Sequence, residues 1–70
     1  MIRETVTSSD LRSVGYDDSE SLLEIEFHNG GVYHYFGVPQ SVYEALMAAG
    51  SKGRYFNAYV RKVYRCERVG

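Results

Sequence analysis

The 70-residue chain contains no tryptophan, one cysteine and one proline, and it has no long hydrophobic run. A single cysteine excludes an intramolecular disulfide framework and any zinc site built from several cysteines. The missing hydrophobic run excludes a membrane-spanning helix, and the polar start MIRETVTSSD lacks the apolar segment of a signal peptide. We therefore expect a cytoplasmic protein that does not contact the membrane.

The chain is also too short to enclose a deep catalytic cavity. A single domain of 70 residues buries about 60–65% of the surface of its unfolded chain and reaches a stability of about 3–5 kcal/mol. Cys66 has no recognisable base, His28 and His34 lack the spacing of zinc ligands, and Gly50–Gly53 lacks the Walker spacing. The sequence predicts a module that is not an enzyme and that binds neither a metal nor a cofactor.

Acidic and basic residues are divided between the two ends of the chain. Residues 1–49 contain two cations against eight acids, a net charge of −6. From Gly50 onward there are six cations against Glu67 alone, a net charge of +5, and aromatic residues are interleaved with these cations. A basic segment with interleaved aromatic side chains is typical of a surface that binds phosphates and bases.

The first half of the chain has the pattern of an antiparallel meander. Leu23, Ile25 and Phe27 alternate with polar residues, which is the period-2 signature of a strand with one buried face. We expect residues 1–8 to be frayed and strands at Leu11–Tyr16, Leu23–Phe27 and Val32–Phe36, with turns at 17–20 and 29–31.

Two registers are possible for the second hairpin. A two-residue turn at Asn29-Gly30 pairs Phe27 with Val32 and turns the tyrosines toward the glutamates. A three-residue loop pairs Phe27 with Tyr33 and Ile25 with Tyr35. We favour the longer loop, because it places both tyrosine rings over the core and His34 in water.

Two helices are expected after the strands. Pro39 suits the first position of a helix that ends at Gly50, and Ser51 can cap the next helix. In that second helix an apolar stripe falls on one side and a basic stripe falls on the other. The apolar stripe is Phe56, Tyr59, Val60 and Val63, and the basic stripe is Arg54, Arg61 and Arg65.

The predicted architecture is therefore α+β, with a three-stranded antiparallel β-meander followed by two short helices packed on one sheet face. The domain proper covers about residues 8–65, and a C-terminal tail follows it.

Each candidate site also has a plain structural interpretation. The basic stripe is either a phosphate-binding surface or a solvated helix face, and the sequence leaves both open. Tyr33 and Tyr35 are either core residues or an aromatic platform for bases. We favour the core, since a platform would share its face with Glu24 and Glu26 and would repel a nucleic acid backbone.

A set of short motifs runs through nearly the whole chain and resembles the KTSC domain family. The motifs are Val14-Gly15-Tyr16-Asp17, Phe27-x-Asn29-Gly30, Tyr33-x-Tyr35, Val38-Pro39, Val42-Tyr43, Leu46, Ala49, Ser51-Lys52-Gly53, Tyr55-Phe56-Asn57, Val60-Arg61 and Tyr64. This family takes its name from a domain at the C-terminus of some lysyl-tRNA synthetases, and it includes small stand-alone bacterial and phage proteins. The resemblance implies a stand-alone module of this kind, with RNA binding as the suggested role of the family.

The resemblance also implies which positions carry the motif. Tyr33 and Tyr35 match the motif tyrosines, and the polar motif positions are Ser51, Lys52, Gly53, Asn57 and Arg61.

The leading hypothesis from the sequence is binding of RNA or tRNA through the second helix. Phosphates would contact Arg54, Arg61, Lys62 and Arg65, one phosphate would lie at Lys52 and the 51–53 turn, and Tyr55 or Tyr64 would stack on bases. The alternative is a protein-interaction module that docks an acidic partner or joins its own basic end to the acidic sheet of a second copy.

Overall fold

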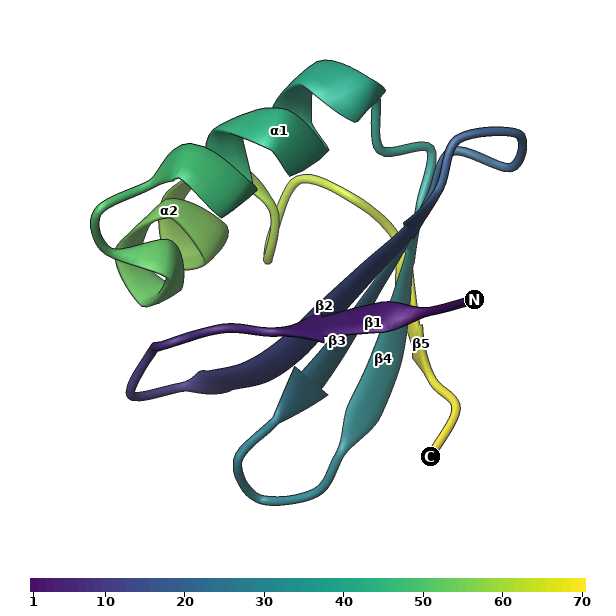
Figure 1. The fold of residues 1–70 in the computed structure, drawn as a ribbon. Coiled ribbons are helices and arrows are strands. Elements are labelled where there is room, and N and C mark those ends of the chain that lie inside the picture. Colours follow the sequence, from purple (N-terminus) through teal and green to yellow (C-terminus); the bar gives the residue numbers. More distant parts are fainter.

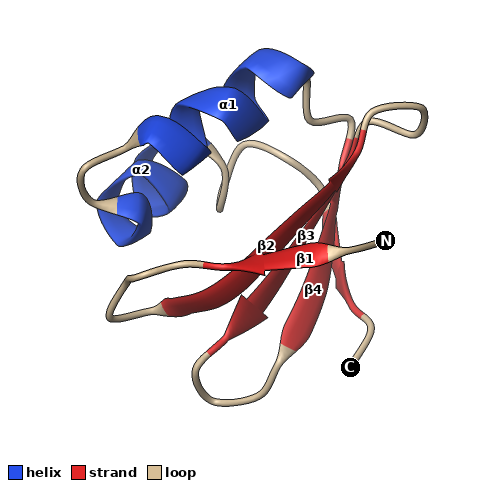
Figure 2. Cartoon of the chain, viewed as in Figure 1, coloured by secondary structure: helices blue, strands red, loops and turns tan.

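Five antiparallel strands form one sheet, and their order in space follows their order along the chain, β1-β2-β3-β4-β5. The computed structural model describes all 70 residues. The strands are β1 (Arg3–Thr5), β2 (Leu11–Asp17), β3 (Leu22–Phe27), β4 (Val32–Phe36) and β5 (Cys66–Arg68), and the helices are α1 (Gln40–Ala48) and α2 (Lys52–Tyr59). Both helices cover the same face of the sheet (Figure 1), which gives the two layers of Figure 2. Neither helix is long and apolar enough to cross a membrane.

The α+β class, the antiparallel sheet and the two helices are confirmed, but the predicted number of strands is wrong. Residues 3–5, expected to be frayed, form edge strand β1 and pair with β2 opposite Ser13, Val14 and Gly15. Every residue of β1 is exposed, so no apolar alternation marks this strand in the sequence. Strand β1 is therefore stabilised by backbone hydrogen bonds to β2 and not by the burial of its side chains.

The second unexpected strand, β5, arises because α2 is shorter than predicted. The helix ends at Tyr59, and the backbone N–H groups of Val60 and Arg61 both donate to the carbonyl oxygen of Phe56. The chain then turns back, and Cys66–Arg68 pairs with β4. Tyr59 and Val63 are consequently 58% and 61% exposed, so the predicted apolar stripe is wrong at these two positions.

The hairpin between β3 and β4 keeps the predicted faces but has a different register. Ile25 lies opposite Tyr33, whereas the sequence predicted Phe27 opposite Tyr33 and Ile25 opposite Tyr35. The loop starts and ends one residue earlier than predicted, so that Gly30 is its last residue. The φ of Gly30 is +93°, in the left-handed region that glycine adopts without strain. A shift of two residues preserves the side-chain faces, and the tyrosines remain on the core face.

The core lies between this face of the sheet and the two helices. Nine hydrophobic residues are buried, namely Leu11, Val14, Leu23, Ile25, Tyr35, Val38, Leu46, Phe56 and Val60. At the start of α1, Tyr43 stacks on Tyr16 with ring centroids 4.8 Å apart, and the Tyr16 hydroxyl donates to the Val38 carbonyl over 2.6 Å. These contacts fix α1 against β2.

The predicted cap of α2 is present, since the Ser51 hydroxyl accepts a hydrogen bond from the Arg54 N–H over 3.3 Å. We expect Ser51→Ala to lower the free energy of unfolding by about 1 kcal/mol, because one N–H at the helix start loses its partner. Urea unfolding followed by circular dichroism measures this loss. Ser41→Ala is the control, because Ser41 is an exposed residue of α1. An equal loss of unfolding free energy in both variants would contradict the capping role of Ser51.

The other face of the sheet carries a charged cluster centred on Glu24. Its carboxylate accepts hydrogen bonds from Arg3 over 2.9 Å and from His34 over 2.6 Å. Glu26 lies 3.8 Å from Arg3 and accepts a hydrogen bond from Ser13. His34 is therefore half-buried against Glu24, and the prediction that this ring lies in water is wrong.

This cluster makes stability depend on pH. Burial alone would raise the pKa of Glu24, but the hydrogen bonds from His34 and Arg3 outweigh it and hold that pKa below its ordinary value of 4.5. A lowered pKa in the folded state stabilises the protein above about pH 4.5, and this contribution disappears as the pH falls further. We expect Glu24→Gln to lower the free energy of unfolding at pH 7 by about 1–2 kcal/mol.

The difference between Glu24→Gln and the wild type is expected to shrink in urea titrations performed below pH 4.5. Glu20→Gln is the matched control, because Glu20 is exposed and its carboxylate has no partner. A pH-independent difference for Glu24→Gln would show that packing rather than charge explains the loss.

Candidate functional site

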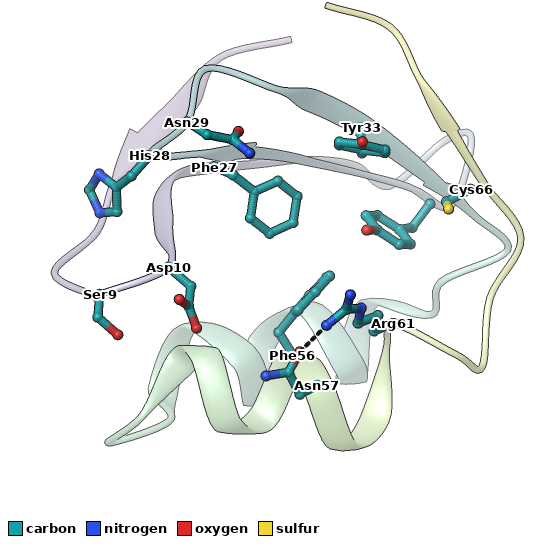
Figure 3. Close-up of a pocket in the computed structure, with 11 residues that line it drawn as sticks. Ser9, Asp10, Phe27, His28, Asn29, Tyr33, Phe56, Asn57, Arg61 and Cys66 are labelled. Atoms are coloured by element: carbon teal, nitrogen blue, oxygen red, sulfur yellow. Dashed lines mark hydrogen bonds between the residues drawn. The ribbon is translucent and has the colours of Figure 1, made fainter.

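A cleft of about 560 Å³ opens between the β3–β4 hairpin and α2. The sheet side of the cleft is formed by Ser9, Asp10 and the hairpin residues Phe27, His28 and Asn29, together with Tyr33 and Tyr35 of β4. The helix side is formed by Phe56, Asn57 and Arg61, and Cys66 closes one end. Figure 3 shows Phe27 from the sheet side and Phe56 from the helix side directed toward the space between them.

Aromatic rings in edge-to-face contact form the wall of this cleft. The ring of Phe56 meets that of Phe27 at a centroid distance of 5.5 Å and that of Tyr35 at 5.3 Å. Phe27 also meets Tyr33 at 5.6 Å. Each contact joins α2 to the hairpin or links neighbouring strands, so the wall is rigid as well as apolar.

The polar groups of the cleft are partly used by the fold, since the His28 ring bonds to the Ser8 carbonyl over 2.8 Å. Arg61 donates one hydrogen bond to Asn57 over 3.4 Å, and the Asn29 side-chain oxygen accepts from the Gly31 N–H, which leaves the Asn29 amino group free. Tyr35 is only 4% exposed as a residue, but its hydroxyl is not among the buried atoms, so it reaches solvent at the cleft. Burial, with smaller contributions from nearby groups, raises the pKa of Tyr35 to about 12, so this hydroxyl stays protonated and able to donate.

The cleft does not contain a nucleophile next to a base. Figure 3 places Cys66 and His28 at opposite ends of it. No three metal-ligating side chains come together elsewhere in the chain. The arrangement is suited to binding rather than to covalent chemistry.

The two motif tyrosines lie on the helix-facing side of the sheet. Tyr35 is buried in the core, and Tyr33 is half-buried with the Arg68 guanidinium 5.9 Å from its ring centre. Neither ring forms an open platform for bases.

Three of the polar motif positions have structural roles. Ser51 caps α2, and the Lys52 ammonium donates to the Ala49 carbonyl at the end of α1 over 3.2 Å. Gly53 lies so close to Asp10 that an added Cβ would be 2.9 Å from a carboxylate oxygen. This acid occupies the positive end of α2, where the sequence analysis placed a phosphate, and it would repel a second anion.

The basic stripe predicted on α2 is interrupted after Arg61. Arg65 lies beyond the helix, where its guanidinium covers the Phe36 ring at 4.3 Å and approaches Glu67 at 3.9 Å. Arg54, Arg61 and Lys62 remain exposed at or just after α2. The expectation of one continuous helical line that includes Arg65 is therefore wrong, because the helix ends at Tyr59.

The aromatic side chains chosen for stacking have different surroundings. Tyr55 pairs with the exposed Tyr59 at a centroid distance of 4.8 Å on the surface of α2. Tyr55 and Tyr64 are both half-buried and pack against the core. Only the first pair presents an aromatic surface beside the free cations.

Sequence reasoning missed the hairpin side of the cleft. Asp10 and Asn29 are 19 residues apart, and they meet at one site because the backbone N–H of His28 donates to the Asp10 carbonyl over 3.1 Å. The only signal in the sequence was the Phe27-x-Asn29-Gly30 motif, whose asparagine and phenylalanine both line the cleft.

The contact between Gly53 and Asp10 can be tested by mutation. We expect Gly53→Ala to gain less than the about 1 kcal/mol that alanine usually gains over glycine in a helix, because the new methyl group must push the Asp10 carboxylate aside. Gly50→Ala is the control, since an added Cβ there meets nothing within 4 Å. In thermal unfolding, Asp10→Ala is expected to restore the missing gain of Gly53→Ala, and simple additivity of the two changes would contradict the contact.

Comparisons with known proteins agree with this arrangement. The model of the KTSC domain family matches residues 7–64. An uncharacterised protein of Stutzerimonas stutzeri is 49% identical over 57 residues, which are 81% of this chain and 80% of that protein. A lysine–tRNA ligase of Nostoc punctiforme is 39% identical over 59 residues, which are 84% of this chain but 10% of the ligase.

The fold agrees as closely as the sequence. The crystal structure of a KTSC domain protein from Yersinia pestis superimposes with a TM-score of 0.96 at 39% identity, and the match covers 99% of this chain and 97% of that chain. The five-stranded sheet and the two helices on one face are thus those of a known domain type, and the chain belongs to the KTSC domain family.

Proposed function

We propose that this domain is a non-catalytic module that binds single-stranded RNA, with α2 and the turn after it as the contact surface. The observation that carries the proposal is a set of exposed cations without acidic partners. Arg54, Arg61 and Lys62 form no ion pair, whereas Arg3 on β1 and Arg65 further along the chain do. Unneutralised cations grouped on one surface attract a phosphate backbone.

Two further observations support RNA over other polyanions. The Tyr55–Tyr59 pair lies on the same helix and presents an exposed ring, on which an unpaired base can stack. The ligase of Nostoc punctiforme, whose name states that it acts on tRNA, contains a homologous segment. A domain that forms part of such an enzyme lies close to bound tRNA, where a contact with RNA can contribute to binding.

The test is a fluorescence anisotropy titration with a labelled single-stranded RNA and with bulk tRNA at two salt concentrations. Three phosphate contacts predict a slope of about −2 for log affinity against log salt. Arg54→Glu with Lys62→Glu is expected to reduce that slope by about 1.4, because two of the three contacts are lost.

Arg12→Glu is the matched charge-reversal control, since Arg12 lies on the opposite face of the sheet beside Arg3 and Glu26. Binding that is absent at low salt, or that Arg12→Glu weakens as much as the double reversal does, would refute the proposal.

Self-association through the acidic sheet has less support than RNA binding. Glu24 and Glu26 on that sheet are already bound to Arg3, so they offer little free charge to the basic segment of a second copy. An acidic protein partner is the remaining alternative, and it is the outcome favoured if the wild type binds acidic peptides but no RNA.

A further inference from the structure

We propose that the outer edge of β5 pairs with the same edge of a second copy of this chain, so that two sheets join across a twofold axis. The inference goes beyond the proposed RNA binding and does not depend on it. Two observations carry it, namely the direction of the free backbone groups of β5 and the order of charges along the strand.

The backbone of β5 has unpaired groups on one side, because this strand is the last of the sheet and lies beyond β4 (Figure 1). The Arg65 carbonyl accepts a hydrogen bond from β4 over 2.9 Å, and the Val69 N–H donates one to β4 over 2.8 Å. Successive residues of an antiparallel strand point their N–H and C=O groups alternately toward and away from the neighbouring strand. The backbone groups of Cys66 and Arg68 therefore point to the free edge.

This edge is also open to solvent. Every residue of β5 is exposed, and so are Arg65 before it and Val69 after it. Open edges can pair with another chain, and charged side chains are one of the features that usually prevent such pairing. The signs and positions of the charges therefore decide whether this edge repels a second copy or matches it.

The hydrogen bonds and the charges together select one register. Two residues with outward backbone groups allow three antiparallel arrangements, with Cys66 opposite Cys66, Cys66 opposite Arg68, or Arg68 opposite Arg68. The second sets Glu67 against Glu67 and the third sets Arg68 against Arg68, and like charges directly opposite destabilise a sheet. The first sets Arg65 of each copy opposite Glu67 of the other. The edge is therefore complementary to itself with Cys66 at the centre.

The two charged side chains are available for these pairs. Within one chain the Arg65 guanidinium and the Glu67 carboxylate are 3.9 Å apart, and the side chains are 71% and 60% exposed, so their own contact contributes little. They lie on the same face of the strand, because they are two residues apart. In the joined sheet each Glu67 lies between two arginines, one from each copy.

The arrangement closes on itself. Its twofold axis passes between the two Cys66 residues, perpendicular to the sheet, so the helices of both copies lie on the same side of the joined sheet. Pairing of β5 with β1 of another copy would instead leave a free edge at each end and continue as an open chain. The inference therefore predicts a dimer and no larger assembly.

The first test is sedimentation equilibrium in a reducing buffer, at protein concentrations up to about 1 mM because a contact of one short strand is weak. The wild type is expected to dimerise. Glu67→Arg sets arginine against arginine in both pairs and is expected to weaken dimerisation about tenfold. Glu4→Arg is the matched control, since it makes the same change of charge on the exposed strand β1 at the other edge of the sheet.

A charge exchange then tests the register. Arg65→Glu combined with Glu67→Arg restores opposite charges only when these two positions face each other, and this double variant is expected to recover the dimer. Circular dichroism checks that each variant is folded. A wild type that stays monomeric, a Glu4→Arg variant weakened as much as Glu67→Arg, or a double variant no better than Glu67→Arg would overturn the inference.

Cross-linking of the wild type gives an independent measurement. Residues directly opposite in a hydrogen-bonded antiparallel pair have Cα atoms about 5.5 Å apart, so a short bifunctional thiol reagent is expected to join two copies through Cys66. Cys66→Ser combined with Glu4→Cys moves the thiol to the other edge and is expected to give little dimer. Equal cross-linking of the two proteins would indicate random collision and contradict the pairing of β5.

Discussion

Leu46→Ala is expected to leave most of the protein unfolded in buffer at 25 °C. Leu46 is 0% exposed and is the one fully buried residue of α1, so it is the main contribution of this helix to the core, beside the half-buried Val42, Tyr43 and Met47. Truncation of a buried leucine costs about 2–5 kcal/mol. A domain of this size has only about 3–5 kcal/mol of stability. Circular dichroism and urea unfolding measure the effect.

Two variants bracket this result. Leu46→Met conserves volume and is expected to cost less than about 1.5 kcal/mol. Leu22→Ala makes the same chemical change at a half-buried position outside the core and is expected to cost about 1 kcal/mol. If Leu46→Ala unfolded at the urea concentration of the wild type, α1 would be dispensable to the core.

The strands found from the sequence are those whose burial alternates along the chain. Leu23 and Ile25 are completely buried while Glu24 between them is half-buried, and this contrast is visible in the sequence. β1 and β5 have no buried residue at all. Their formation depends on free backbone groups at the edges of β2 and β4, which no residue pattern reports.

The end of α2 escaped prediction for a related reason. Residues 56 to 63 keep an apolar spacing that suits a longer helix, and no proline or glycine interrupts it. The helix ends because Val60 is already completely buried and the chain must return to pair with β4. A tertiary contact therefore overrides the local pattern, and Arg65 moves from the helix to the Phe36 ring.

The candidate site was predictable in part. Asn57 and Arg61 lie on a segment that the charge pattern singles out, and both line the cleft. Asp10 carries no such mark, because one acid among eight in the first half of the chain looks like ordinary surface charge. Its role depends on the pairing of β2 with β3 and on a glycine 43 positions later, which only the folded chain brings together.

Phe56→Ala is the second change expected to be severe, with a loss of about 3–5 kcal/mol in the free energy of unfolding. Phe56 is 3% exposed and meets the rings of Phe27 and Tyr35 edge to face. It therefore joins α2 to both strands of the hairpin and forms the wall of the cleft at the same time. Urea unfolding is expected to show little or no native baseline for this variant.

Phe56→Leu divides that loss into its parts. Leucine refills most of the volume but loses two aromatic edge contacts, each worth about 0.5–1.5 kcal/mol, so a total loss of about 1–3 kcal/mol is expected. Tyr59→Leu, on an exposed ring of the same helix, is expected to change stability little. If Phe56→Leu were as stable as the wild type, the rings would contribute volume alone.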